Sequence, residues 1–197
     1  MGIARPISKI LNPFSLSVTA LLLVSYATSI SLSEFSRWAL VIVSFLVVLP
    51  IVYARVRTPL AAGSGLMTDP MVFFRQHRKE LWLIGILCAV PCVLLLVFLE
   101  APTLVIATLV ALLVTSLAVS LVNRVFRASY HLAAVTTLVT VLIFAWGNTA
   151  LPIVAVIPLI GWARYTLGEH SPAQMVAGCG LAIIACSASV YGFGLLG

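Results

Sequence analysis

The chain is short of charge. Only 8% of its 197 residues are Asp, Glu, Lys or Arg, whereas 62% are hydrophobic. A soluble domain is about half apolar and about a quarter charged. This balance excludes a fold whose whole surface faces water, and it makes lipid the solvent for most of the chain. A length that would suit one soluble domain is here divided into spans of about 20 residues each.

Groups that bind metals are also scarce. The chain has five acidic residues and three histidines, and its four cysteines lie inside apolar runs. Those runs supply no polar partners for a metal ion. The sequence therefore predicts no metal site and no cofactor, and we interpret the cysteines as buried small hydrophobic residues. They are Cys88, Cys92, Cys179 and Cys186.

A cleavable signal peptide is not expected, because no small-residue cleavage pattern follows the first apolar run. That run is instead the first of seven apolar segments, each of which must be helical in lipid. We therefore predict an all-α, polytopic membrane bundle of about seven transmembrane helices. The sixth segment is the shortest and reaches only about 21 Å at the helical rise. The segments are Ser15 to Leu32, Trp38 to Ala54, Leu81 to Leu99, Ala101 to Val122, His131 to Gly147, Ala150 to Ala163, and Ala173 to Leu196.

These segments suggest a division of the chain into an N-terminal segment (1–14), two N-terminal helices (15–54), a basic interfacial loop (55–80) and a helical core (81–197). If all seven segments cross, ten of the eleven Lys and Arg residues, all except Arg37, fall on one side. The positive-inside rule places that side in the cytoplasm. In the loop, apolar residues 71–74 followed by cations at 75–79 are typical of an interfacial helix on anionic headgroups. We expect an integral protein of a bacterial or archaeal plasma membrane.

Two clusters on the predicted cytoplasmic side carry most of the reactive side chains. One runs from Arg127 to His131 and the other from Arg164 to Gln174. Ionisable groups at the edge of a membrane are costly and usually functional. Arginine forks and the N-termini of helices that begin near Ser129 and Ser171 bind phosphoryl oxygens well. One neutral imidazole can attack phosphorus, and a second, protonated, can give a proton to the leaving oxygen.

The spacing within these clusters resembles the type 2 phosphatidic acid phosphatase superfamily, whose members share a six-helix membrane core. Arg164-x5-His170-x3-Gln174 is similar to the family's Ser-Arg-x5-His-x3-Asp motif. Arg127-Ala-Ser129-Tyr-His131 is similar to its Pro-Ser-Gly-His motif, in a divergent Lys-x-Ser-x-His form. The resemblance covers roughly residues 81–197.

This resemblance implies a metal-independent phosphatase that acts on a lipid phosphate or a prenyl diphosphate. His170 would be the nucleophile that forms a phosphohistidine, and His131 would protonate the leaving group. Side chains that would hold the phosphoryl oxygens are Arg127, Ser129 and Arg164. The implied partners are the phosphorylated lipid or prenyl substrate and membrane lipids, with no nucleic acid; the oligomeric state is left open.

Two departures from the family pattern affect the site. No Lys-x6-Arg-Pro motif is present, and its role would pass to Arg127, or to Arg78 and Lys79. The aspartate that orients the nucleophile is Gln174, which can still accept from an imidazole four residues away but stabilises an imidazolium less. A weaker nucleophile favours a good leaving group, so a diphosphate ester would suit this site better than a monophosphate.

Simpler interpretations remain for each residue. Ser171-Pro-Ala-Gln174 is also a helix start with a capping box, so that Gln174 can serve the helix end, the histidine, or both. Arg164 alone would be a snorkelling anchor and Arg127 a topology charge. The alternative function is a catalytically weakened, phosphatase-like protein that binds or transports a phosphorylated lipid. A small transporter without phosphate chemistry would show interrupted helices in matching halves.

Overall fold

The computed structural model describes residues 3–62 and 78–195, and within these ranges the ordered elements are helices, without a β-strand. Among the described residues, four helical stretches are long and apolar enough to cross a membrane, and two shorter apolar helices accompany them. The chain is thus an all-helical protein with the composition of an integral membrane protein. The four stretches are Leu32–Val56, Thr103–Val122, Tyr130–Thr166 and Pro172–Gly192, and the shorter helices are Pro13–Thr28 and Leu83–Phe98.

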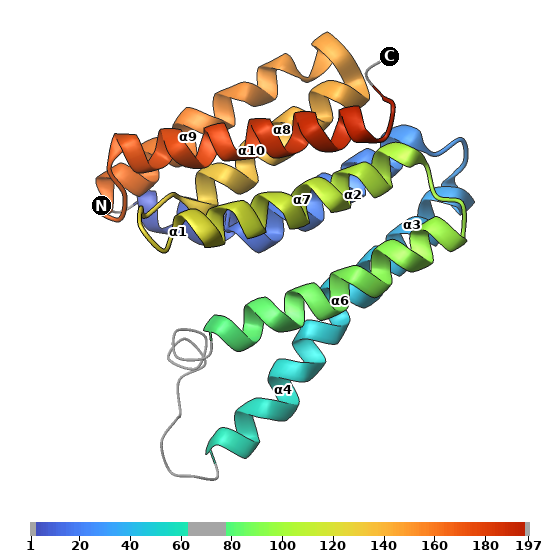
Figure 1. The fold of residues 1–197 in the computed structure, drawn as a ribbon, viewed down its shortest axis with the longest axis horizontal. Coiled ribbons are helices and arrows are strands. Elements are labelled where there is room, and N and C mark those ends of the chain that lie inside the picture. The colour runs from blue at the N-terminus through green and yellow to red at the C-terminus, as the bar shows by residue number, and fades with distance from the viewer. Residues whose placement is uncertain (1–2, 63–77, 196–197) are drawn as a thin grey trace.

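Four helices form the centre of the molecule: α2 (Pro13–Thr28), α7 (Thr103–Val122), α8 (Tyr130–Trp146) and α10 (Pro172–Gly192). The pairs α2–α8, α7–α10 and α8–α10 pack most extensively (Figure 1). Helix α8 is buried on nearly all sides, from Leu132 to Leu142. Its N-terminal residues therefore lie where several helix ends meet.

A second group of helices extends away from this centre. It consists of α3 (Leu32–Val43), a π-helical stretch (Ser44–Val48), α4 (Leu49–Ala62) and α6 (Arg78–Phe98) (Figure 1). Among residues 83–98 of α6, whose side chains are described, one stripe is buried, at Ala89, Cys92 and Leu96. Most of its apolar side chains therefore face the surroundings, as in a helix that borders lipid. The structure thus groups α2 with α7, α8 and α10, and α6 with α3 and α4.

The second apolar segment differs from the prediction at both of its ends. Helix α3 begins at Leu32 rather than at Trp38, because Ser31 is its N-cap and accepts from the N–H of Glu34 (3.2 Å). The Glu34 carboxylate accepts in turn from the N–H of Ile30 (2.8 Å). Serine followed three residues later by glutamate is a helix-start pattern. At the other end α4 continues to Ala62, and the predicted interfacial helix at 71–79 falls mostly outside the described residues.

The sixth segment is longer in the structure than predicted, because it has more residues and because part of it is a 3-10 helix. A 3-10 helix of nine residues, Gly147–Ala155, begins before the predicted start at Ala150, and α9 (Val156–Thr166) adds eleven more residues. A 3-10 helix rises about 2.0 Å per residue and an α-helix about 1.5 Å. The two parts together cover about 34 Å, compared with about 30 Å for the hydrocarbon core of a bilayer. The reversal before this segment occurs at Gly147, whose φ is +60°.

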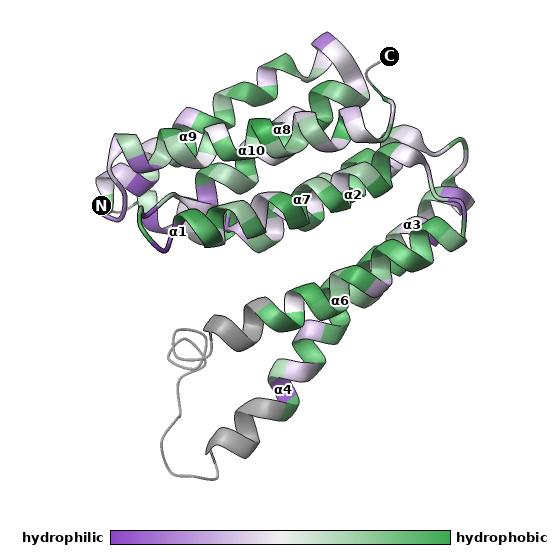
Figure 2. Ribbon diagram, viewed as in Figure 1, coloured by the Kyte–Doolittle hydropathy of each residue, from purple (hydrophilic) through white to green (hydrophobic). Residues whose placement is uncertain are grey.

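The connections gather at two ends of the molecule. Helix α1 (Ala4–Ile10), the α7–α8 connection and the α9–α10 connection lie at one end, and the C-terminus and the end of α8 lie at the other (Figure 1). Hydrophilic residues concentrate at these ends, whereas the helix centres are hydrophobic (Figure 2). The end that carries α1 is the one on which the two predicted clusters fall.

Candidate active site

Ser129 begins α8 and ties it to α10. It is the N-cap of α8, and its Oγ accepts from the N–H of Leu132 (3.5 Å). Its own N–H donates to the carbonyl oxygen of Gln174 in the first turn of α10 (3.0 Å). The residue is completely buried. Ser129 therefore holds two helix ends together, and its hydroxyl faces the helix end rather than an open site.

This contact depends on a glycine in α10. A Cβ atom on Gly178 would lie 2.5 Å from the carbonyl oxygen of Ser129 and 3.3 Å from its nitrogen. Real Cβ atoms do not approach a backbone oxygen that closely, so only glycine fits while the helices keep this spacing. Small residues allow such close approach between membrane helices.

The start of α10 combines a helix cap with a contact to histidine. Ser171 and Gln174 form a complete capping box, as the sequence pattern predicts. The Gln174 Oε1 atom accepts from the N–H of Ser171 (3.1 Å) and lies 3.2 Å from Nδ1 of His170. The two roles considered for Gln174, helix cap and partner of the histidine, are both present.

These contacts set the tautomer of His170. A backbone N–H can only donate, so the Ser171 contact fixes the oxygen of the Gln174 amide toward residues 170 and 171. An oxygen facing Nδ1 makes Nδ1 the protonated nitrogen of the neutral ring. The lone pair then resides on Nε2. His170 is half-buried, and this arrangement leaves Nε2 as the nucleophilic atom of the ring.

Helix α9 ends in a turn that shapes the second part of the site. The N–H of Glu169 donates to the carbonyl of Arg164 (3.1 Å) and the N–H of Gly168 to that of Tyr165 (2.9 Å). Gly168 has a φ of +67°. This is the Schellman geometry, in which glycine adopts the left-handed conformation after the helix. The turn brings Glu169 back toward Arg164 and directs His170 toward the start of α8.

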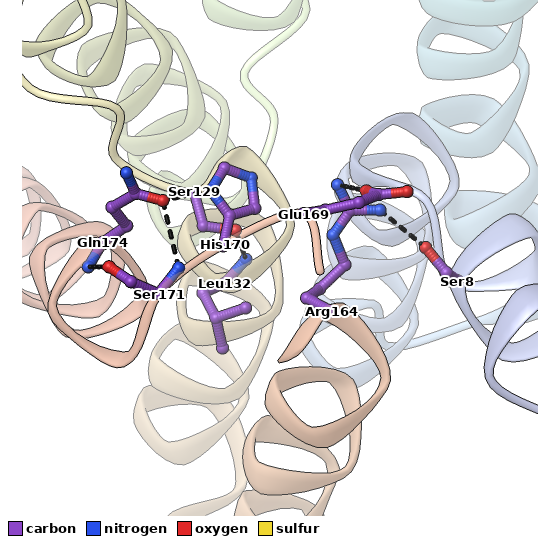
Figure 3. A network of polar contacts seen from close by, with 8 residues as sticks. All are labelled: Ser8, Ser129, Leu132, Arg164, Glu169, His170, Ser171 and Gln174. Carbon is purple, nitrogen blue, oxygen red and sulfur yellow. Dashed lines mark hydrogen bonds and ion pairs between the residues drawn. The ribbon is translucent and has the colours of Figure 1, made fainter. Parts of the chain in front are cut away.

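Arg164 is nearly buried and is held from two sides. Its side chain is 11% exposed, and one guanidinium nitrogen, Nη2, forms an ion pair with Glu169. The other, Nη1, donates to Oγ of Ser8 in helix α1 (2.8 Å). Figure 3 shows Ser8, Arg164 and Glu169 beside the group formed by His170, Ser171 and Gln174. The buried Nε atom has no hydrogen-bond partner among the described residues.

His131 joins the two parts of the site. It is half-buried in the first turn of α8 and forms a hydrogen bond with the backbone of Ser8. It also lies close enough to Arg164 and His170 to interact with them electrostatically. The two clusters, about 40 residues apart in sequence, therefore meet as one group.

The remaining predicted residues either lie apart from the group formed by His131, Arg164 and His170 or have side chains outside the described residues. Arg127 is exposed in the α7–α8 connection. Arg78 and Lys79 are in the first turn of α6, but their side chains fall outside the described residues. Within the described ranges, no three His, Cys, Asp or Glu side chains are grouped closely enough to hold a metal ion.

Sequence reasoning assigned no role to Ser8 or Glu169. Ser8 is buried and lies 156 residues from Arg164, and no motif links the two positions. Glu169 lies within the second cluster and next to His170, so its proximity to Arg164 could have been inferred from the Gly168 turn signal.

Comparison with known proteins does not assign the chain to a group. No protein-family model matches it, and no curated protein or solved structure is similar enough to count as a match. Its function must therefore be inferred from the geometry of this site.

Proposed function

We propose that the protein is a membrane-embedded phosphatase that hydrolyses a lipid phosphate or prenyl diphosphate through a phosphohistidine on His170. The observation that carries this proposal is the convergence of His170, His131 and Arg164 at one end of the bundle. These three side chains come from the start of α10, the start of α8 and the end of α9. They supply a nucleophile, a proton donor and a fixed positive charge, which phosphoryl transfer requires.

The reaction proceeds in two steps. Nε2 of His170 attacks phosphorus, and the bond between phosphorus and the leaving oxygen breaks as His131, whose protonated form the charge of the bound phosphate favours, donates a proton to that oxygen. Water then attacks the phosphohistidine, His131 takes the proton from this water, and inorganic phosphate leaves. Nδ1–H of His170 remains directed at Gln174 (3.2 Å) throughout. Arg164 faces the charge that develops on the phosphoryl oxygens.

The neutral partner of His170 favours a good leaving group. An amide oxygen orients the imidazole but stabilises a developing imidazolium less than a carboxylate does. In serine proteases, replacement of the orienting aspartate by asparagine lowers kcat by about 10⁴. A diphosphate ester, whose leaving group is a phosphate, demands less of the nucleophile. We therefore propose a diphosphate as the preferred substrate, with Arg127, Arg78 and Lys79 as further contacts for its second phosphate.

An apolar chain on the substrate fits the surroundings of the site. A cavity of about 220 Å³ between α2, α7 and α8 is lined mainly by apolar groups, among them Phe14, Leu112 and Val119. Tyr130, which adjoins His131, also lines it. This volume exceeds that of engineered apolar cavities of about 150 Å³ that bind benzene, so part of a hydrocarbon chain can enter it.

We further propose seven membrane crossings, with helices α2, α3–α4, α6, α7, α8, the 3-10 helix with α9, and α10 each making one. The last five would correspond to part of the six-helix core of the type 2 phosphatidic acid phosphatases. The positive-inside rule then places the site at the cytoplasmic surface. This arrangement is supported by the two ends at which the connections gather.

The proposal is tested by phosphate release in detergent, with EDTA present, from matched lipid monophosphates and prenyl diphosphates. Wild type should release phosphate, His170→Ala should abolish release, and His131→Ala should slow it severely. His77→Ala, which removes the chain's third histidine, is the matched control and should retain wild-type activity. If wild type binds these lipids without any turnover, the alternative of a binding or transport protein is correct.

A further inference from the structure

The guanidinium of Arg164 already holds an anion in this structure. Its Nη2 atom is paired with the carboxylate of Glu169, and its Nη1 atom donates to Ser8. A phosphoryl oxygen that approaches Arg164 from solvent would need the N–H groups on the Glu169 side, because Ser8 and helix α1 cover the other side. The nearest anionic group to the proposed phosphate-binding arginine is therefore part of the protein itself.

The position of Glu169 is set by the backbone rather than by the ion pair alone. Its N–H is bonded to the carbonyl oxygen of Arg164, and the left-handed Gly168 closes the turn between them. The two partners differ in exposure: the side chain of Arg164 is 11% exposed and that of Glu169 is 44% exposed. The carboxylate can thus swing into water without loss of the turn, whereas the guanidinium stays in place.

We propose that Glu169 is an internal competitor for the phosphate site, whose carboxylate occupies Arg164 until a substrate phosphate displaces it. This inference rests on the proposed function, because it assumes that Arg164 binds phosphate. Carboxylate and phosphate cannot share the same guanidinium edge, and their charges repel. An anion can therefore bind Arg164 only after the Glu169 carboxylate has moved away from it. The apparent affinity for the anion is then the intrinsic affinity multiplied by the fraction of molecules in which Arg164 is not paired with Glu169.

Because a substrate must displace the Glu169 carboxylate, it needs enough negative charge to compete for Arg164. The phosphodiester headgroups that make up most of a bilayer carry one negative charge on their phosphate and interact weakly with a single arginine. Terminal monophosphates and diphosphates carry more charge and offer several oxygens to the guanidinium fork. A site that is closed by its own carboxylate therefore excludes bulk phospholipid and opens for end-group phosphates.

The test measures binding without turnover. Every variant carries His170→Ala in the full chain in detergent, and titration calorimetry follows the binding of inorganic phosphate and pyrophosphate. Added Glu169→Gln should tighten the Kd of both ligands by roughly 3- to 10-fold, the range expected for removal of a partly exposed ion pair. Glu100→Gln, which removes the same charge at the opposite end of the bundle, should leave both values unchanged.

The alternative roles give different results. If Glu169 only supports Arg164, Glu169→Gln will weaken binding or leave it unchanged, and the inference fails while the phosphate site stands. If neither the parent nor Glu169→Gln binds either anion, the phosphate site itself is absent, and the proposed function fails together with the inference. Equal melting temperatures of the variants show that the comparison is between folded proteins.

Discussion

The backbone N–H of Ser129 donates to the carbonyl oxygen of Gln174 at 3.0 Å, so the start of α8 and the first turn of α10 are joined through main-chain atoms. His131 follows Ser129 by two residues, and His170 precedes Gln174 by four. The distance between the two histidines is therefore set by a backbone contact near them both. A change that separates these helix ends should disturb the site without altering either histidine.

Gly178→Ala makes such a change. Its Cβ would lie 2.5 Å from the Ser129 carbonyl oxygen, so α10 must move away from α8. We expect loss of most phosphatase activity and a lower melting temperature in detergent, with overpacking that costs about 1–3 kcal/mol. Gly180→Ala on the same helix is the control, because its Cβ would meet nothing within 4 Å. Equal behaviour of the two variants would show that the close approach is unimportant.

Gln174→Glu tests the orienting role of residue 174. Glutamate has the same length, so it keeps the contacts to Ser171 and His170 and adds a negative charge beside the imidazole. We expect turnover of a monophosphate to rise at least about tenfold, within the 10⁴-fold range known for such partners. Gln174→Ala should lower turnover. The initial rates of the three proteins with one lipid monophosphate measure this, and no gain with glutamate would remove the basis for a diphosphate preference.

Ser8→Ala tests whether helix α1 belongs to the site. The change removes the acceptor at 2.8 Å from Nη1 of Arg164, and hydrogen bonds to charged groups contribute about 1.5–3 kcal/mol. We expect a lower melting temperature in detergent. Ser17→Ala is the control, since its Oγ donates to the Pro13 carbonyl within the same helix, α2 (2.8 Å). A melting temperature for Ser8→Ala equal to that of this control would mean that α1 does not support Arg164.

The proposed orientation is tested by labelling of introduced cysteines. Val125→Cys places a thiol on an exposed residue at the end that carries the site, and Asn148→Cys places one at the opposite end. A membrane-impermeant maleimide added to intact cells should label position 148 only, and permeabilised cells should show both. Wild type provides the background from its four cysteines. Labelling of position 125 in intact cells would reverse the cytoplasmic placement.

Much of the local structure could be predicted from the sequence. The serines at 129 and 171 mark helix starts because their side chains satisfy free N–H groups, and both are N-caps in the structure. The apolar segments predicted helices because lipid leaves the backbone no other partner. The contact between His170 and Gln174 follows from their spacing of four residues, which needs no tertiary information.

Other features depend on packing that no local pattern specifies. The contact between Ser8 and Arg164 joins positions 156 residues apart, and a single serine in a polar segment gives no signal for it. The association of α2 with α8 was not predicted, because apolar faces toward lipid and toward protein have the same composition. The 3-10 winding of Gly147–Ala155 was also missed, since its apolar residues are equally compatible with an α-helix.

The central claim is that His170 accepts the phosphoryl group, and trapping of the phosphoenzyme tests it most directly. The purified protein is mixed with a prenyl diphosphate that carries radioactive phosphorus in its terminal phosphate, and the reaction is stopped with alkali, in which phosphohistidine is stable. We predict label on wild type that acid removes, and none on His170→Ala. Absence of label on wild type during measured turnover, or equal label on His170→Ala, would contradict the account.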